Sequence, residues 1–147
     1  MKRVILVALC VLFASMAWAQ PAQTVTVAQN QSLSPVINLA GTGVVPRVPL
    51  TGMIIMPPSA LESTSYEIIL YACADPAGAN CMSMADSAGN LIKYIIVGGA
   101  TPTSAMVLDP TVVVGLWWFK FRIAASNDTA VSQTTASRSF IILSRTL

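Results

Sequence analysis

The stretch GLWWFKFRIA, residues 115–124, decides the fold class because apolar side chains recur along it with the spacing of a β-strand. Neighbouring side chains of a strand point to opposite faces, so every second residue shares a face. The second face places Trp118 beside the cations Lys120 and Arg122 and is either a plain protein surface or a place where a partner binds. The first face is wholly apolar and is predicted to pack into the core; it carries Trp117, Phe119, Phe121 and Ile123.

The rest of the chain repeats short runs of β-branched and aromatic residues and shows no sustained helical period. Gly, Pro, Asn and Asp are frequent in the stretches between these runs, as expected of turns. Seven or eight short strands at this spacing favour an all-β fold, a single antiparallel β-sandwich or jelly-roll-like domain. The predicted strands cover residues 36–39, 50–56, 66–73, 81–84, 91–97, 105–108, 116–124 and 139–143.

The last predicted strand, 139–143, is apolar on both faces. Either Phe140 and Ile142 or Ile141 and Leu143 therefore point into the core. A strand with two apolar faces lies in the middle of a sheet or is covered by a partner.

The N-terminus has the three parts of a secretory signal peptide. A basic start, an apolar run and the small residues before Gln20 predict a signal peptide at 1–19, followed by a polar leader or edge strand at 20–31 and the β-sandwich domain at 32–147. The apolar run is short for a membrane span, so no stable span is expected after cleavage, although an uncleaved N-terminal anchor is the alternative. We expect an exported protein, in the periplasm, at the cell surface or secreted.

The charge balance argues against nucleic acid as a partner. Of the 8 Lys and Arg residues, Lys2 and Arg3 belong to the predicted signal peptide, which leaves 6 cations against 6 anions and a net charge of zero. Nucleic-acid binding needs clustered basic residues. Only 10% of the residues are charged, below the usual quarter or so. Part of such a surface is expected to be covered by another copy, in a homo-oligomer, or by another protein.

Two cysteines lie outside the predicted signal peptide, in the stretch CADPAGANC. Cys73 and Cys81 flank a turn rich in Pro, Gly and Asn, and in an exported chain such a pair predicts a disulfide between adjacent strands. In a protein that stays in the cytosol the same pair would be two reduced cysteines.

The sequence offers little material for catalysis. It contains no histidine, which removes the commonest general base, the commonest metal ligand and every triad that needs imidazole. The segment 86–90, DSAGN, has too few oxygen ligands for calcium and is typical of a hairpin turn. We therefore predict that the protein is not an enzyme and has no catalytic, cofactor-binding or metal-binding residues.

Trp118, Lys120 and Arg122 are the candidate contact face, called the tryptophan strip below. Trp and Arg are preferred anchors at protein interfaces, and an indole beside two cations also suits a small ligand such as a glycan. The alternative is that Trp118 covers the sheet while the lysine and arginine stems lie over apolar surface.

Three segments carry a resemblance to a known group of proteins: LTGMIIMPPSALESTSYEIILYACAD (50–75), LDPTVVVGLWWFKFRIA (108–124) and AVSQTTASRSFIILSR (130–145). In this order and spacing they resemble small β-sandwich proteins encoded among the virion genes of tailed bacteriophages. The resemblance implies a non-enzymatic structural role in a capsid-associated or surface-associated particle, as in decoration proteins. The matching positions are Met56-Pro57, Asp75, Leu108-Asp109-Pro110, Arg122, Gln133 and Arg138.

Two functions are therefore expected from the sequence. The first is a virion-associated or surface-associated structural or assembly protein that acts through protein–protein contacts. The alternative is an exported periplasmic or cell-surface module that binds a glycan or another surface ligand, through the tryptophan strip and the loops at 75–80 and 86–90. The expected location depends on the signal peptide. If it is cleaved, the protein is expected in the periplasm, at the cell surface or secreted; otherwise it is expected in the virion.

Overall fold

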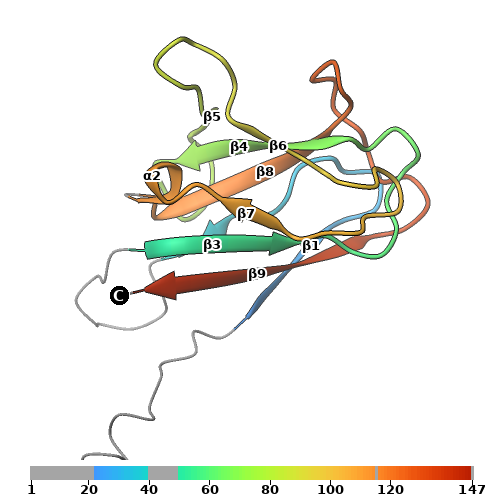
Figure 1. Ribbon diagram of the computed structural model, residues 1–147, viewed down its shortest axis with the longest axis horizontal. Helices are drawn as coiled ribbons and strands as arrows, with labels where there is room; N and C mark the ends of the chain where they lie inside the picture. Colours follow the sequence, from blue (N-terminus) through green and yellow to red (C-terminus); the bar gives the residue numbers. More distant parts are fainter. Residues whose placement is uncertain (1–21, 40–49, 115, 147) are drawn as a thin grey trace, which may run out of the picture.

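Two antiparallel β-sheets lie face to face, one above the other in Figure 1. This computed structural model describes residues 22–39, 50–114 and 116–146. The predicted signal peptide, 1–19, lies outside these ranges. The predicted β-sandwich is confirmed.

The two sheets differ in how their strands are arranged. The first sheet has the order β1-β9-β3-β7, in which β9 and β3 are central. The second sheet has the order β2-β8-β4, and both β5 and β6 pair with the far edge of β4. The strands of the first sheet are β1 (Gln23–Val27), β9 (Arg138–Thr146), β3 (Leu50–Met56) and β7 (Met106–Leu108). Those of the second are β2 (Ile37–Asn38), β8 (Trp118–Ala124), β4 (Glu67–Cys73), β5 (Cys81–Ser83) and β6 (Lys93–Ile95).

Along the chain, the strands alternate between the sheets, except for β4, β5 and β6, which stay together in the second. This crossing pattern, with every pair antiparallel, is the topology of a jelly roll. A single turn of helix, α2 (Pro110–Val113), connects β7 to β8. Asp109 begins it by accepting a 2.8 Å hydrogen bond from the Thr111 backbone N–H, and Pro110 suits the first helical position.

The core lies between the sheets and is built from the inward residues of each strand. Phe121 of β8 and Phe140 of β9 meet edge-on in its middle, with ring centroids 4.8 Å apart. Their contact joins the two sheets, because β8 and β9 are both internal strands. The other fully buried large side chains of this core are Phe119, Ile37, Met53, Ile55, Ile68, Leu70, Ile96, Leu108 and Ile123.

The prediction that Trp117 belongs to the core is wrong. Strand β8 begins one residue later, at Trp118, whose cross-strand partner is Cys73 at the end of β4. Trp117 thus lies beyond the last pair of the ladder, is 39% exposed and meets the Trp118 ring edge-on at 5.7 Å. The period-two pattern correctly predicted the face of Phe119, Phe121 and Ile123 but could not place the strand's first residue.

Strand β9 resolves the ambiguity left by its two apolar faces. Phe140 and Ile142 point into the core, whereas Ile141 is 39% exposed on the outer side. Strand β9 lies centrally between β1 and β3, but this position leaves its outer side exposed at Ile141. Residues 23–27 form the edge strand β1, which adds Val25 and Val27 to the core.

Candidate contact surfaces

The tryptophan strip lies on the outer face of the second sheet, along β8. Lys120 is tied to the loop between β4 and β5, because its ammonium donates a 3.1 Å hydrogen bond to the carbonyl of Gly78. Gly78 has a φ of 69°, a conformation that favours glycine. The ammonium and part of its stem are therefore covered by the protein's own loop.

Arg122 is also engaged within the chain. Its guanidinium donates to the carbonyl of Asp128 at 3.2 Å and lies over the ring of Tyr71, 5.5 Å from the centroid. Trp118 is half-buried, and its indole nitrogen has no hydrogen-bond partner among the described residues. The structure thus keeps the three residues on one face but holds both cations internally. Contact between this strip and a partner stays a prediction.

The predicted disulfide joins Cys73 of β4 to Cys81 of β5. The two residues stand directly opposite each other, with Cα atoms 4.0 Å apart. The neighbouring pair is hydrogen bonded, since Ala74 N–H donates to the carbonyl of Asn80 at 2.9 Å. Cys73 and Cys81 therefore form the close, non-hydrogen-bonded type of pair, where a short bridge fits between adjacent strands.

Two acids and a lysine form a cluster beside the strip. The ammonium of Lys93 lies 3.4 Å from the carboxyl of Glu67 and 2.8 Å from that of Asp128. Burial raises the pKa of Glu67 above its ordinary 4.5, and a hydrogen bond with Asp128 acts in the same direction, while Lys93 partly opposes both. The hydrogen bond from Lys93 lowers the pKa of Asp128. Glu67 is only 2% exposed, so the cluster joins β4, β6 and the 125–130 turn rather than meeting a substrate.

The outer face of the first sheet has a different character. Ile54 of β3 stands opposite Leu143 of β9 on one side and Val107 of β7 on the other, and Met56 stands opposite Ile141. These five residues, called the apolar face below, form one block across three neighbouring strands. Val107 is 70% exposed, and Met56 and Ile141 about 40%. At the other outward positions of this sheet, Thr24, Thr26 and Ser139 carry hydroxyl groups, and Gly52 stands opposite Arg145 in the register.

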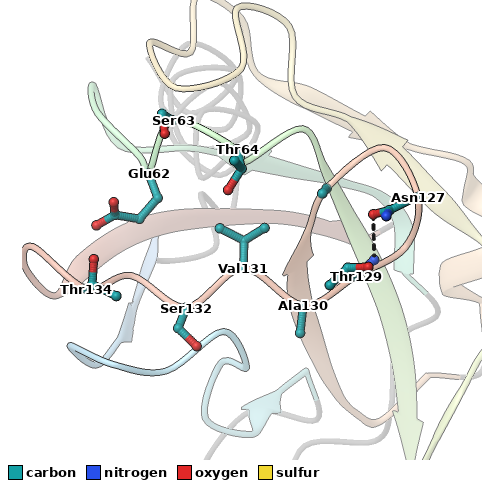
Figure 2. Close-up of a pocket in the computed structure, with 10 residues that line it drawn as sticks. Glu62, Ser63, Thr64, Asn127, Thr129, Ala130, Val131, Ser132 and Thr134 are labelled. Carbon is teal, nitrogen blue, oxygen red and sulfur yellow. Dashed lines mark hydrogen bonds between the residues drawn. The ribbon is translucent and has the colours of Figure 1, made fainter.

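A shallow groove of about 550 Å³ opens between residues 62–64 and the chain that follows β8 (Figure 2). Thr129 and Asn127 are linked at one end of it by a 3.2 Å hydrogen bond. No aromatic side chain is among the residues that line it. Hydroxyl groups dominate the lining and come from Ser63, Thr64, Thr129, Ser132 and Thr134.

Glu62 and Gln133 fix the two walls of this groove to each other. The Glu62 carboxylate accepts 2.8 Å hydrogen bonds from the backbone and hydroxyl of Thr135, which lower its pKa. Gln133, fully buried, accepts from the Glu62 backbone N–H at 3.1 Å and donates to the Ser65 hydroxyl at 3.3 Å and the Val131 carbonyl at 3.2 Å. Since all three polar contacts of the Gln133 amide are internal, its role here is structural.

The described residues contain no group of three His, Cys, Asp or Glu side chains that could hold a metal ion. Across residues 22–39, 50–114 and 116–146, no helix has the length and hydropathy needed to cross a bilayer. No family model, characterised protein or solved structure matches the chain.

Sequence reasoning missed the apolar face. Its members lie on three strands that are far apart in the chain, and each strand taken singly carries only one or two of them. A signal was present, because residues 53–56 and 140–143 are continuous apolar runs rather than alternating ones. Such runs mark strands whose outer side is also apolar.

Proposed function

We propose that this protein is a non-enzymatic structural or assembly component, virion-associated or surface-associated, that works through protein–protein contacts. The apolar face carries the proposal. The largest apolar patch on a protein surface is often functional, whereas scattered apolar residues on a surface are ordinary. Ile54 and Val107 stand opposite each other in the register, and Met56 lies two residues along β3 on the same face.

The topology is compatible with this role without deciding it. Jelly rolls serve both in viral capsids and in lectin domains, so the fold alone supports two classes of function. The resemblance of residues 50–145 to virion proteins of tailed bacteriophages favours the first class. A low overall charge favours a surface that another protein covers.

The test is the size of the protein in extracts of the cells or particles that produce it naturally. A structural component sediments with a particle or a large complex, and Val107→Lys removes it from that complex. If the tryptophan strip is the contact, Trp118→Ala has that effect instead. A protein that sediments as a free monomer in every fraction contradicts the proposal.

The compartment is tested on the same material by intact mass. A chain that begins at Gln20 with Cys73 and Cys81 bridged supports export to the periplasm or the cell surface. A full-length chain supports assembly in the cytoplasm and places the protein with virion components.

The groove between residues 62–64 and 125–134 favours a second function, binding of a glycan. Five hydroxyl side chains line it, and hydroxyl groups both donate and accept hydrogen bonds, as sugars do. The lack of an aromatic side chain in its lining leaves no platform for a sugar ring, which is why this function ranks second. Titration calorimetry with oligosaccharides tests it. Saturable binding that Thr129→Val and Ser132→Ala weaken supports a glycan module, and no heat of binding excludes it for the sugars used.

A further inference from the structure

We propose that the side chains of Lys93 and Asp128 join in an intramolecular amide bond, an isopeptide cross-link, with Glu67 as the residue that transfers the protons. The three residues come from separate segments: Glu67 begins β4, Lys93 begins β6, and Asp128 lies in the turn after β8. The reaction takes place within one chain and once per chain. It therefore goes beyond the proposed function and does not rest on it.

The fold holds the amine and the carboxyl group in contact. The Nζ atom of Lys93 lies 2.8 Å from Oδ1 of Asp128, and the carbon that the amine attacks is one bond from that oxygen. Lys93 stands opposite Ile69, which is two residues along the same face of β4 from Glu67. Well-oriented groups within one molecule react as though present at about 10⁵–10⁸ M. Such proximity favours amide formation between groups that do not combine when free in water.

The backbone of Asp128 is fixed from two sides. Its N–H donates a 3.0 Å hydrogen bond to the carbonyl of Ala125, and its own carbonyl accepts one from Arg122 at 3.2 Å. Its φ of 64° makes the chain turn sharply at this residue. The chain neighbours of Asp128, Asn127 and Thr129, are labelled at one end of the groove in Figure 2. The turn therefore presents the carboxyl group to the amine in a defined position.

Glu67 is placed to accept a proton from the amine. Its Oε1 atom lies 3.4 Å from Nζ of Lys93, and the residue is only 2% exposed. The hydrogen bond to Asp128, with Glu67 acting in the same direction, raises the pKa of Lys93, so its amine becomes a nucleophile only by giving a proton to a nearby base. Burial raises the pKa of Glu67, whereas the hydrogen bond from Lys93 lowers that of Asp128. Of the two acids, Glu67 is thus the better proton acceptor.

The step needs no outside reactant. The carboxylate of Glu67 takes a proton from the ammonium of Lys93, and the freed amine attacks Cγ of Asp128, which forms the Nζ–Cγ bond. Glu67 then passes this proton, and afterwards a second one from the same nitrogen, to the leaving carboxyl oxygen. The Cγ–Oδ bond breaks, one water departs, and Glu67 returns to its starting state with no change of oxidation state.

Partial exposure of the two reacting side chains sets the pace. The side chains of Lys93 and Asp128 are 38% and 41% exposed, so the released water has a path to solvent. Hydration of the ion pair also opposes the reaction, since water must leave the reacting groups first. We therefore expect the link to accumulate slowly in the folded protein.

The link would fasten a short edge strand to the far side of its sheet. Strand β6 has three residues and pairs only with β4 among the described strands, whereas Asp128 follows β8 on the other side of β4. The joined residues are 35 positions apart in the chain. Closing a loop of this length restricts the unfolded chain, as a disulfide does.

The experiment is mass spectrometry of the full chain, freshly purified and after several days of storage. The cysteines are reduced, and the protein is digested with trypsin, which cuts after a free lysine but not after a cross-linked one. The linked chain is expected to give one branched peptide, in which residues 48–120 are joined to residues 123–138. That peptide, like the intact chain, is lighter by one water than its unlinked counterpart.

Three variants test the assignment of roles. Glu67→Gln removes the proton acceptor and is expected to slow formation of the link about 100-fold or more. Lys93→Arg keeps the positive charge without the amine, so the branched peptide and the loss of water should both be missing. Lys120→Arg is the matched control on β8 and should form the link at the unsubstituted rate. Near-UV circular dichroism verifies that each variant is folded; if Glu67→Gln is not, the partly exposed Lys93→Arg carries the test.

The contrary results are equally specific. Complete cleavage after Lys93 in both the fresh and the stored protein overturns the proposal. A loss of water confined to Asp128, as in a succinimide, overturns it as well. A link that forms equally fast in Glu67→Gln overturns the role assigned to Glu67.

Discussion

The carboxyl group of Glu67, almost fully buried on β4, lies 3.4 Å from the ammonium of Lys93 on β6, and yet its pKa is raised. Burial dominates over the attraction of the nearby cation, because Lys93 is itself partly exposed and shared with Asp128 at 2.8 Å. A buried carboxyl group is costly to ionise, so Glu67 makes folding sensitive to pH.

The substitution Glu67→Gln tests the direction of that sensitivity. A raised pKa means that the folded state binds the proton more tightly than the unfolded chain, so the stability from Glu67 is complete below pH 4.5 and is lost as the pH rises through the folded-state pKa. Glutamine stays neutral and escapes this loss. Relative to the unsubstituted protein, the free energy of unfolding of Glu67→Gln is expected to increase as the pH rises above 4.5, measured by urea unfolding.

Glu62→Gln is the matched control, with the opposite sign. The pKa of Glu62 is lowered by its bonds from Thr135, so its stability is present above pH 4.5 and is lost as the pH falls through the folded-state pKa. The relative stability of Glu62→Gln should therefore decrease as the pH rises through that window. Parallel slopes for the two variants would show that burial does not control Glu67.

Replacing Gln133 by Met should destabilise the sandwich, because it removes buried hydrogen bonds between segments that are far apart in the chain. Methionine keeps the length of the side chain but leaves the N–H of Glu62 and the hydroxyl of Ser65 without their internal partners. The expected loss is about 2 kcal/mol of unfolding free energy. Gln29→Met removes an exposed hydrogen bond to the Thr134 carbonyl and should change stability by less than about 0.5 kcal/mol. Equal losses of stability in Gln133→Met and Gln29→Met would mean that burial does not strengthen the contribution of the Gln133 hydrogen bonds.

Gly78→Ala combines backbone strain with a clash. Its φ is 69°, and an added Cβ would lie 2.3 Å from Val36 Cγ2 and 2.7 Å from Lys120 Cε. Gly89→Ala, at φ 85° with open space around it, isolates the strain. We expect Gly89→Ala to cost about 1 kcal/mol and Gly78→Ala about 1–3 kcal/mol more, by thermal or urea unfolding. Equal losses of unfolding free energy in Gly78→Ala and Gly89→Ala would show that the 74–80 loop moves away from Lys120 without cost.

The disulfide should contribute to stability through the loop that it closes. The sequence separation of 8 between Cys73 and Cys81 corresponds to a loss of about 2–3 kcal/mol in the variant in which both become Ser. A reducing agent should destabilise the unsubstituted protein by the same amount and leave the double variant unchanged. A double variant as stable as the bridged protein would mean that the hairpin is held by its ladder alone.

Local sequence patterns predicted much of the fold, and the exceptions are informative. Ile68 and Leu70 point inward as their alternation indicates, but Ile69, on the outward side, is also fully buried. It stands opposite Lys93 on one strand and Arg122 on the other, and the long apolar stems of such residues are able to shield an apolar neighbour from water. Burial of an outward residue depends on its neighbours across the ladder, which alternation does not identify.

By itself, the sequence determined the strand pattern, the inward face of β8 and the pairing of Cys73 with Cys81, because each is a property of residues close together in the chain. Only the tertiary structure decided which strands share a sheet. The strand register places Ile54 beside both Leu143 and Val107. The folded chain also brings Gln133 against Glu62, which is 71 residues away in the sequence. Surfaces and buried polar contacts arise from such long-range neighbours, so the apolar face became visible only when β3, β7 and β9 lay side by side.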